Sequence, residues 1–145
     1  MKGRNFEKGF TLIELMIVVI ILSTLAAMIV PRLAGRSDES KRAAAHADID
    51  ANLGNALDLY ELDNGFYPTS DQGLRALVEA PATSPVPSRW KGPYVKKGEF
   101  KDPWGNPYQY RAPGTINRDY DLFSFGPNGA EGGNDDIGNW SADPK

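Results

Sequence analysis

The chain has 145 residues and a formal net charge of −3, which leaves room for one modest folded domain and gives no electrostatic support for nucleic-acid binding. It contains no cysteine, which excludes a disulfide framework, a cysteine-ligated zinc site and a thiol nucleophile. Its one histidine, His46, lies in an alanine-rich stretch without a second metal ligand at suitable spacing, and we interpret it as a surface or interface residue.

An apolar segment near the N-terminus dominates the pattern. Residues 15–30 carry no charge, and residues 10–30 are interrupted only by Glu14. At about 1.5 Å per residue this segment forms a helix of about 31 Å, so it is predicted to span a membrane. The preceding residues 1–9 are basic, which predicts a cytoplasmic N-terminus and an exported remainder. A charged Glu14 would cost about 2–3 kcal/mol in such a helix, so it needs a partner unless it reaches the membrane interface.

The run Gly9-Phe10-Thr11-Leu12-Ile13-Glu14-Leu15 resembles the processing signal of type IV pilins and type II secretion pseudopilins. The resemblance implies that a prepilin peptidase cleaves between Gly9 and Phe10 and that the new amino terminus of Phe10 is methylated. It also implies that Glu14 pairs with the terminal amine of a neighbouring subunit. The chain then divides into a leader (1–9), a hydrophobic transmembrane and assembly helix (10–31) and a periplasmic domain (32–145).

An ordinary secretory signal is the alternative interpretation of the N-terminus, with small residues at Ala26 and Ala27 as a cleavage site. The apolar run is long for a signal peptide. In addition, an ordinary signal explains neither the Gly9-Phe10 junction nor Glu14, so we favour the prepilin interpretation.

Helical spacing continues beyond the apolar segment. Pro31 is predicted to bend or loosen the helix, and the run Ser37-Asp38-Glu39 predicts a new helix start. The helix is predicted over 38–63 and is expected to stop at Asn64-Gly65. Its buried face is predicted to consist of Ile49, Leu53, Ala56, Leu57 and Tyr60.

The remaining residues predict short elements joined by turns. A short helix is expected over 71–79, capped by Thr69 or Ser70, and a proline-rich loop is expected over 81–93. Short strands are predicted at 94–95, 108–110 and 120–125, with a Pro- and Gly-dictated turn at 102–107. The predicted fold class is α+β: a long N-terminal α-helix, with a transmembrane half and an amphipathic half, packs on a small antiparallel β-sheet.

The order of motifs over nearly the whole chain resembles the major pseudopilins of the type II secretion system. The matching segments are residues 62–65, 67–69, 72–74, 76–78, 102–110, 112–114 and 136–140. Type IV pilins usually close their C-terminal region with a disulfide, which this chain cannot form. A type IV pilin, a minor pseudopilin and a monomeric membrane-anchored calcium-binding module remain the alternatives.

The resemblance implies a structural subunit of an inner-membrane system whose C-terminal domain is periplasmic. Its N-terminal helices polymerise into a homopolymeric filament, the pseudopilus, which works with minor pseudopilins. An inner-membrane assembly platform driven by a cytoplasmic ATPase adds the subunits. Growth of the filament helps to export folded proteins across the outer membrane.

Acidic residues gather near the C-terminus. Between Asp119 and Asp136 there are five acids and two asparagines among several glycines. Such oxygen ligands suit calcium, although composition alone favours a solvated acidic loop, and no EF-hand pattern is present. The resemblance implies one calcium ion, bound by Asn128, Asp135 and Asp136 with the carbonyl oxygens of Phe125 and Ser124. The family has Asp where this chain has Asn128, so a weaker affinity is expected.

An enzyme was the remaining hypothesis. Asp119 and Asp121 share one face of a predicted strand, and Asp135 and Asp136 could approach them, so a carboxylate pair could serve glycoside hydrolysis. With one isolated histidine, no cysteine and little chain to build a cleft, we predict a structural protein without catalytic residues.

Overall fold

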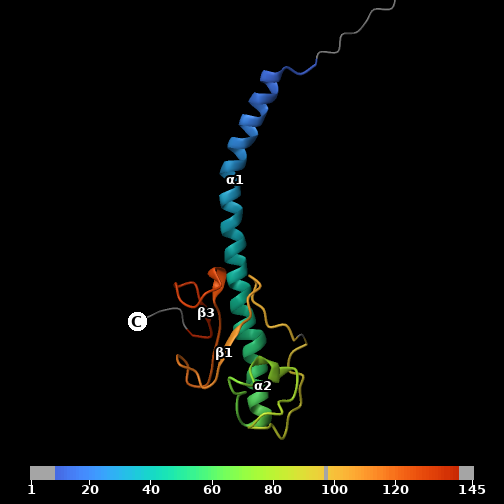
Figure 1. The fold of residues 1–145 in the computed structure, drawn as a ribbon, viewed down its shortest axis with the longest axis vertical. Coiled ribbons are helices and arrows are strands. Elements are labelled where there is room, and N and C mark those ends of the chain that lie inside the picture. Colours follow the sequence, from blue (N-terminus) through green and yellow to red (C-terminus); the bar gives the residue numbers. More distant parts are fainter. Residues whose placement is uncertain (1–8, 97, 141–145) are drawn as a thin grey trace, which may run out of the picture. The chain divides into compact units, whose positions relative to one another are not determined.

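The structure, a computed structural model, describes residues 9–96 and 98–140, with the backbone alone for residues 28–36. It divides into two units, residues 1–37 and residues 38–145, which are described separately below. The longest element is the helix α1, Leu12–Ala47, which belongs to both units (Figure 1). The short elements of the sheet all belong to the second unit.

The described part of the first unit is helical from Leu12 onward. Side chains 12–27 are exposed on every side of the helix. Among the residues that the structure describes, no helix has both the length and the apolar character needed to cross a membrane. The predicted span, 10–31, includes residues 28–31, whose side chains lie outside the described residues.

The predicted helix start at Ser37-Asp38-Glu39 is wrong, because α1 runs through these residues without a break. Asp38 instead has a structural role in the middle of the helix. Its carboxylate pairs with Arg42 one turn later, Nε to Oδ2 at 3.3 Å, and accepts a hydrogen bond from Trp104 Nε1 at 3.2 Å. Asp38 therefore joins the helix to the turn at residues 102–107.

A π-helical turn, η1 (Asp48–Leu53), joins α1 to the next helix, α2 (Gly54–Asn64). The amide of Gly54 donates to the carbonyl oxygen of Ile49, five residues back. A Cβ at Gly54 would lie 2.9 Å from that oxygen, so glycine permits the close turn. The predicted helix end is confirmed: Gly65 has φ 84° and donates its amide to Glu61 O at 2.6 Å.

The sheet has three short antiparallel strands in the order β1 (Gln109–Arg111), β2 (Asp121–Ser124) and β3 (Ile137–Gly138). The strands predicted at 108–110 and 120–125 are thus confirmed within a residue or two, whereas 94–95 is not a strand. Strand β3 was not predicted. The helix predicted over 71–79 is shorter, a 3₁₀ turn η2 (Leu74–Leu77), and Thr69 Oγ1 accepts from the amide of Gln72 just before it.

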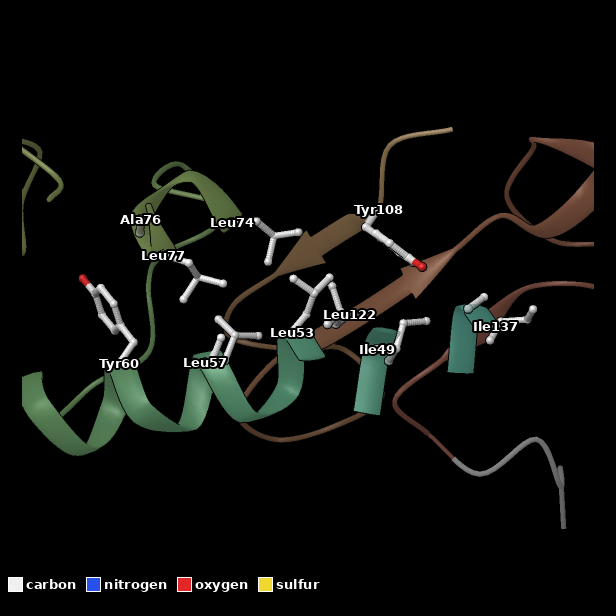
Figure 2. Close-up of a cluster of buried hydrophobic side chains, with 12 residues drawn as sticks. Ile49, Leu53, Leu57, Tyr60, Leu74, Ala76, Leu77, Tyr108, Leu122 and Ile137 are labelled. Atoms are coloured by element: carbon white, nitrogen blue, oxygen red, sulfur yellow. The ribbon is translucent and has the colours of Figure 1, made fainter. Parts of the chain in front are cut away.

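The core lies between the helices, η2 and the sheet. Figure 2 shows Leu57 of α2 and Leu77 of η2 pointing toward one another, and Leu53 of η1 and Leu122 of β2 belong to the same buried cluster. All the residues of the predicted buried helix face are buried. Burying side chains of this size contributes about 1.5–3 kcal/mol each, which is how a helix and a small sheet remain together. The α+β class is confirmed.

Candidate functional site

The N-terminal helix begins with a cap that the sequence analysis missed. Thr11 Oγ1 accepts a hydrogen bond from the amide of Glu14 at 3.3 Å, and Thr11 O accepts one from the amide of Leu15 at 3.2 Å. The Thr-x-x-Glu spacing, typical of a capping box, was the available signal. Glu14 therefore lies in the first turn, where the positive end of the helix dipole favours a carboxylate. No described residue donates a hydrogen bond to this carboxylate.

The side chains around this helix are apolar and exposed. Phe10 is 78 % exposed, Leu12 76 % and Ile20 60 %. One stripe at helical spacing lines a shallow apolar groove and consists of Leu12, Leu15, Met16, Val19 and Ile20. The two hydroxyl side chains in the run bond back to the helix, Ser23 to Val19 O and Thr24 to Ile21 O, so they present little polarity to a neighbour.

The second candidate site is the glycine-rich loop, residues 125–136, which connects β2 to β3. Pairing of Ser124 with Ile137 brings the two ends of the loop together. A 3₁₀ turn, η3 (Gly126–Asn128), begins the loop. Gly126 has φ 69°, and a Cβ there would collide with the backbone oxygen of Asp135, so glycine is required where the two sides of the loop meet.

Two of the predicted calcium ligands, Asn128 and Asp135, contact one another across this loop, and a third, Asp136, bonds to Gly132 within it. Asn128 Nδ2 donates to Asp135 Oδ1 at 2.7 Å, and the amide of Asn128 lies 3.3 Å from Asp135 Oδ2. Asp136 Oδ2 accepts from the amide of Gly132 at 2.8 Å. The other oxygen, Asp136 Oδ1, is buried and has no hydrogen-bond partner. A buried carboxylate oxygen without a donor is costly, and a cation would satisfy it.

The fit to calcium depends on oxygens other than carboxylates. In the described part of the chain no three carboxylate, imidazole or thiol groups are arranged to hold a metal ion. Asp135 and Asp136 would therefore need the amide oxygen of Asn128 and backbone carbonyls to complete a shell of six to eight oxygens. The hydroxyl of Ser124 has partners outside the predicted ligand set, since it donates to Asp102 Oδ2 at 2.5 Å and accepts from the amide of Gly126.

Asp102 is a buried acid whose role was not predicted. Its Oδ1 accepts from the amides of Trp104 at 3.0 Å and Asn106 at 2.8 Å, which shapes the turn at 102–107. Its Oδ2 holds Ser124 on β2. The Asp-Pro pair at the start of this turn was the signal for its local hydrogen bonds, but the contact with Ser124 depends on the folded sheet.

Asp121 is the second buried acid, 1 % exposed. Its carboxylate accepts from Thr115 N and Oγ1 at 2.6 and 2.8 Å, from Ile116 N at 3.0 Å and from Asn117 N at 2.8 Å. Burial alone would raise the pKa of this carboxyl, but the hydrogen bonds from Asn117, Thr115 and Ile116 outweigh it and lower the pKa. Asp119 is exposed, so the two acids of the enzyme hypothesis do not face a common site.

Comparison with known families matches most of the chain. Residues 32–140 match the family described as type II secretion system (T2SS), protein G. Residues 4–30 match the prokaryotic N-terminal methylation motif, and this range of the chain includes Gly9, Phe10 and Glu14. The two matches follow one another along the chain.

Individual relatives match this chain in sequence over nearly their whole length. Proteins named type II secretion system core protein G are 52 % identical in Pseudomonas aeruginosa, covering 94 % of this chain and 97 % of the relative, and 49 % identical in Vibrio cholerae, covering 97 % of both. The crystal structure of the major pseudopilin from the type 2 secretion system of enterohaemorrhagic Escherichia coli is similar, with TM-score 0.66, 43 % identity, and coverage of 77 % of this chain and 96 % of that one. The chain therefore belongs to the type II secretion system protein G family, the major pseudopilins, which are structural subunits and not enzymes.

Proposed function

We propose that the chain polymerises through its N-terminal helix into the pseudopilus of a type II secretion system. The observation that carries this proposal is the helix that is apolar and exposed on all sides over residues 12–27, apart from Glu14 and the two hydroxyl residues. A helix of this kind is stable only in apolar surroundings. The membrane supplies them before assembly, and neighbouring copies of the same helix supply them in the filament.

Processing prepares the helix for this role. A prepilin peptidase cleaves between Gly9 and Phe10, and the new amino terminus of Phe10 is methylated. The terminal amine then lies four residues from Glu14 on its own chain and can approach Glu14 of a neighbour. Two opposite charges buried together cost far less than either charge alone, so the pair sets the axial register of neighbouring subunits.

The site of action follows from this topology. The unassembled subunit is held in the inner membrane with a cytoplasmic N-terminus, and the domain 32–145 lies in the periplasm. An assembly platform in the inner membrane, driven by a cytoplasmic ATPase, adds subunits to a filament that contains minor pseudopilins. Filament growth then helps to move folded proteins through the outer membrane.

Cysteine crosslinking in cells tests the assembly proposal. The chain has no cysteine, so Met16→Cys together with Ile20→Cys, both in the apolar stripe, introduces the two thiols per subunit that a ladder needs. Pairing of the terminal amine with Glu14 of a neighbour offsets the two helices by four residues, so position 16 of one subunit lies beside position 20 of the next. We expect an oxidation-dependent ladder of crosslinked subunits that is lost on adding Glu14→Ala and kept on adding Glu39→Ala, a matched acid later on the same helix. An undiminished ladder with Glu14→Ala would contradict the role of Glu14. No ladder in the cysteine variant that keeps Glu14 would favour a monomeric membrane-anchored protein.

We further propose that the glycine-rich loop binds one calcium ion through Asp135, Asp136 and Asn128, with the carbonyl oxygens of Phe125 and Ser124. The unpartnered buried oxygen of Asp136 supports this assignment. When bound, calcium would neutralise the loop carboxylates and hold the two sides of the loop together. The ion would thus crosslink the loop, as a disulfide does in other proteins, in a chain that has no cysteine.

Thermal unfolding of the full-length protein in detergent tests the metal proposal. Calcium at 100 times its Kd stabilises the folded state by about 2.7 kcal/mol, so the midpoint should be higher in calcium than in chelator. Asp136→Asn should abolish the difference, and Asp119→Asn, which changes an exposed acid outside the loop, should preserve it. Equal midpoints for the parent protein in calcium and in chelator would remove calcium from the account.

A further inference from the structure

We propose that the side-chain amide of Asn128 closes the glycine-rich loop in the absence of any metal ion. The amide nitrogen donates a hydrogen bond to the loop carboxylate of Asp135. We call this set of contacts the Asn128 clamp: Asn128 with Ala130, Gly132 and Asp135. The clamp itself does not require calcium, and only its consequence for calcium affinity rests on the metal site proposed above.

The orientation of the amide is determined by its partners. Asn128 Oδ1 accepts from the amide of Ala130 at 2.7 Å, and a backbone N–H can only donate. Asn128 Nδ2 faces Asp135 Oδ1 at 2.7 Å and Gly132 O at 3.4 Å, and both of these can only accept. The opposite orientation would place oxygen against the carboxylate and NH₂ against an N–H group. The donor side of Asn128 therefore points at the acids.

The other acids of the loop also find donors within the protein. Glu131 accepts from Arg111 on β1 at 2.8 Å, and the Arg111 guanidinium lies 5.0 Å above the ring of Phe123. Asp136 accepts from the amide of Gly132 at one of its two oxygens. Three carboxylates are thus held by one guanidinium, one side-chain amide and backbone N–H groups. Asp136 Oδ1 is the one buried carboxylate oxygen of the described loop that stays without a donor, and the bonds to the other oxygens can hold the loop closed without an ion.

Calcium must compete with this arrangement. The ion takes oxygen ligands, so the amide has to turn over before its oxygen can ligate, and the bonds to Ala130 and Asp135 break. A carboxylate at position 128 would behave in the opposite way, because it would repel Asp135 until a cation arrived. With asparagine at position 128 the loop closes without calcium, whereas with a carboxylate there it would need the ion. Calcium binding therefore stabilises the asparagine form of the loop less.

Hydrogen exchange of the full-length protein in detergent and chelator tests the clamp. Removing one such hydrogen-bonded group changes a local opening equilibrium by about fivefold. We expect loop amides to exchange about fivefold faster in Asn128→Ala and faster still in Asn128→Asp, with calcium restoring protection in Asn128→Asp. The exchange rates of the backbone amides of β1 and β2 should be unchanged, which separates local opening of the loop from unfolding of the domain. Asn55→Ala, an exposed asparagine on α2, should exchange like the parent.

The outcomes separate the clamp from the metal site. If the parent and Asn128→Ala exchange equally fast in chelator, the clamp is overturned, whatever calcium does. If Asn128→Ala opens the loop in chelator but isothermal titration detects no calcium binding to any variant, the clamp stands and the metal proposal fails. If Asn128→Asp is as well protected in chelator as the parent, the inferred repulsion from Asp135 is wrong and the clamp is overturned.

Discussion

Replacing Asp121 by asparagine changes one buried atom and should destabilise the domain strongly. The carboxylate accepts hydrogen bonds from the loop 115–117, which precedes β2 in the chain, and so holds that loop on the strand. In Asp121→Asn one acceptor oxygen becomes an NH₂ group of nearly the same size. The side chain still fits, but it can no longer serve all its donors.

The magnitude follows from the geometry. Oδ2 serves the amide and hydroxyl of Thr115 and the amide of Ile116, and Oδ1 serves the amide of Asn117. If the oxygen of the new amide takes the Oδ2 position, its NH₂ faces the Asn117 amide, which loses its acceptor. The remaining bonds lose their charge. Hydrogen bonds to a charged group contribute about 1.5–3 kcal/mol, and since removing the buried charge recovers part of this, we expect a net loss of about 2–4 kcal/mol.

Urea unfolding of the full-length protein in detergent, followed by tryptophan fluorescence, measures this loss. The control is Asp119→Asn, the same chemical change at an exposed position two residues earlier, which should alter the free energy of unfolding by less than about 0.5 kcal/mol. If Asp121→Asn also changed it by less than about 1 kcal/mol, the carboxylate would not organise the loop and the reasoning would be refuted.

Acid should weaken the domain through the same residue. Because the folded-state pKa of Asp121 is lowered, its contribution is fully present above the unfolded-state value of about 3.9 and is lost as the pH falls toward the folded-state value. In that window the parent should lose up to about 1.4 kcal/mol per pH unit from this group. Asp121→Asn cannot titrate there, so its stability should fall less steeply with acid. Parallel pH profiles would contradict this assignment.

Three further substitutions test the packing, each by urea unfolding of the full-length protein. Leu57→Ala removes a fully buried side chain and should cost about 3 kcal/mol, whereas Leu59→Ala, half exposed on the same helix, should cost less than about 0.5 kcal/mol. Trp104→Phe keeps most of the ring but loses the hydrogen bond to Asp38, so a loss of about 1 kcal/mol is expected. Gly126→Ala forces a side chain onto the Asp135 carbonyl at positive φ and should cost about 2 kcal/mol; an unchanged midpoint would mean that the loop is not closed as described.

Periodicity and turn chemistry were reliable where they were local and strong. The buried face from Ile49 to Tyr60 and the stop at Gly65 follow from helical spacing and from the left-handed conformation that glycine readily adopts. The false start at Ser37 shows the limit, because a capping residue has meaning only where a helix begins, and α1 does not begin there. Asp38 is used instead for a contact with Trp104, far away in the sequence.

Other features depend on pairings that a linear pattern does not contain. Strand β3 is two residues long and exists because it pairs with β2. The π-helical turn at Asp48–Leu53 has no characteristic residue pattern that would distinguish it from an α-helix in the sequence. In the candidate calcium site, the resemblance predicts Asn128, Asp135 and Asp136 as ligands, which stays a prediction; the fold joins Asn128 to Asp135 by a hydrogen bond across the loop and Asp136 to Gly132. The direction in which the Asn128 amide faces depends on three separate partners, so it could only be seen in the structure.

The central claim is that the chain is a processed subunit that assembles through its N-terminal helix. The intact mass of the protein extracted from membranes tests it most directly. The account predicts the loss of residues 1–9 and the gain of one methyl group on Phe10. A mass that retains the leader, or one reduced by a cleavage near Ala26-Ala27, would contradict it.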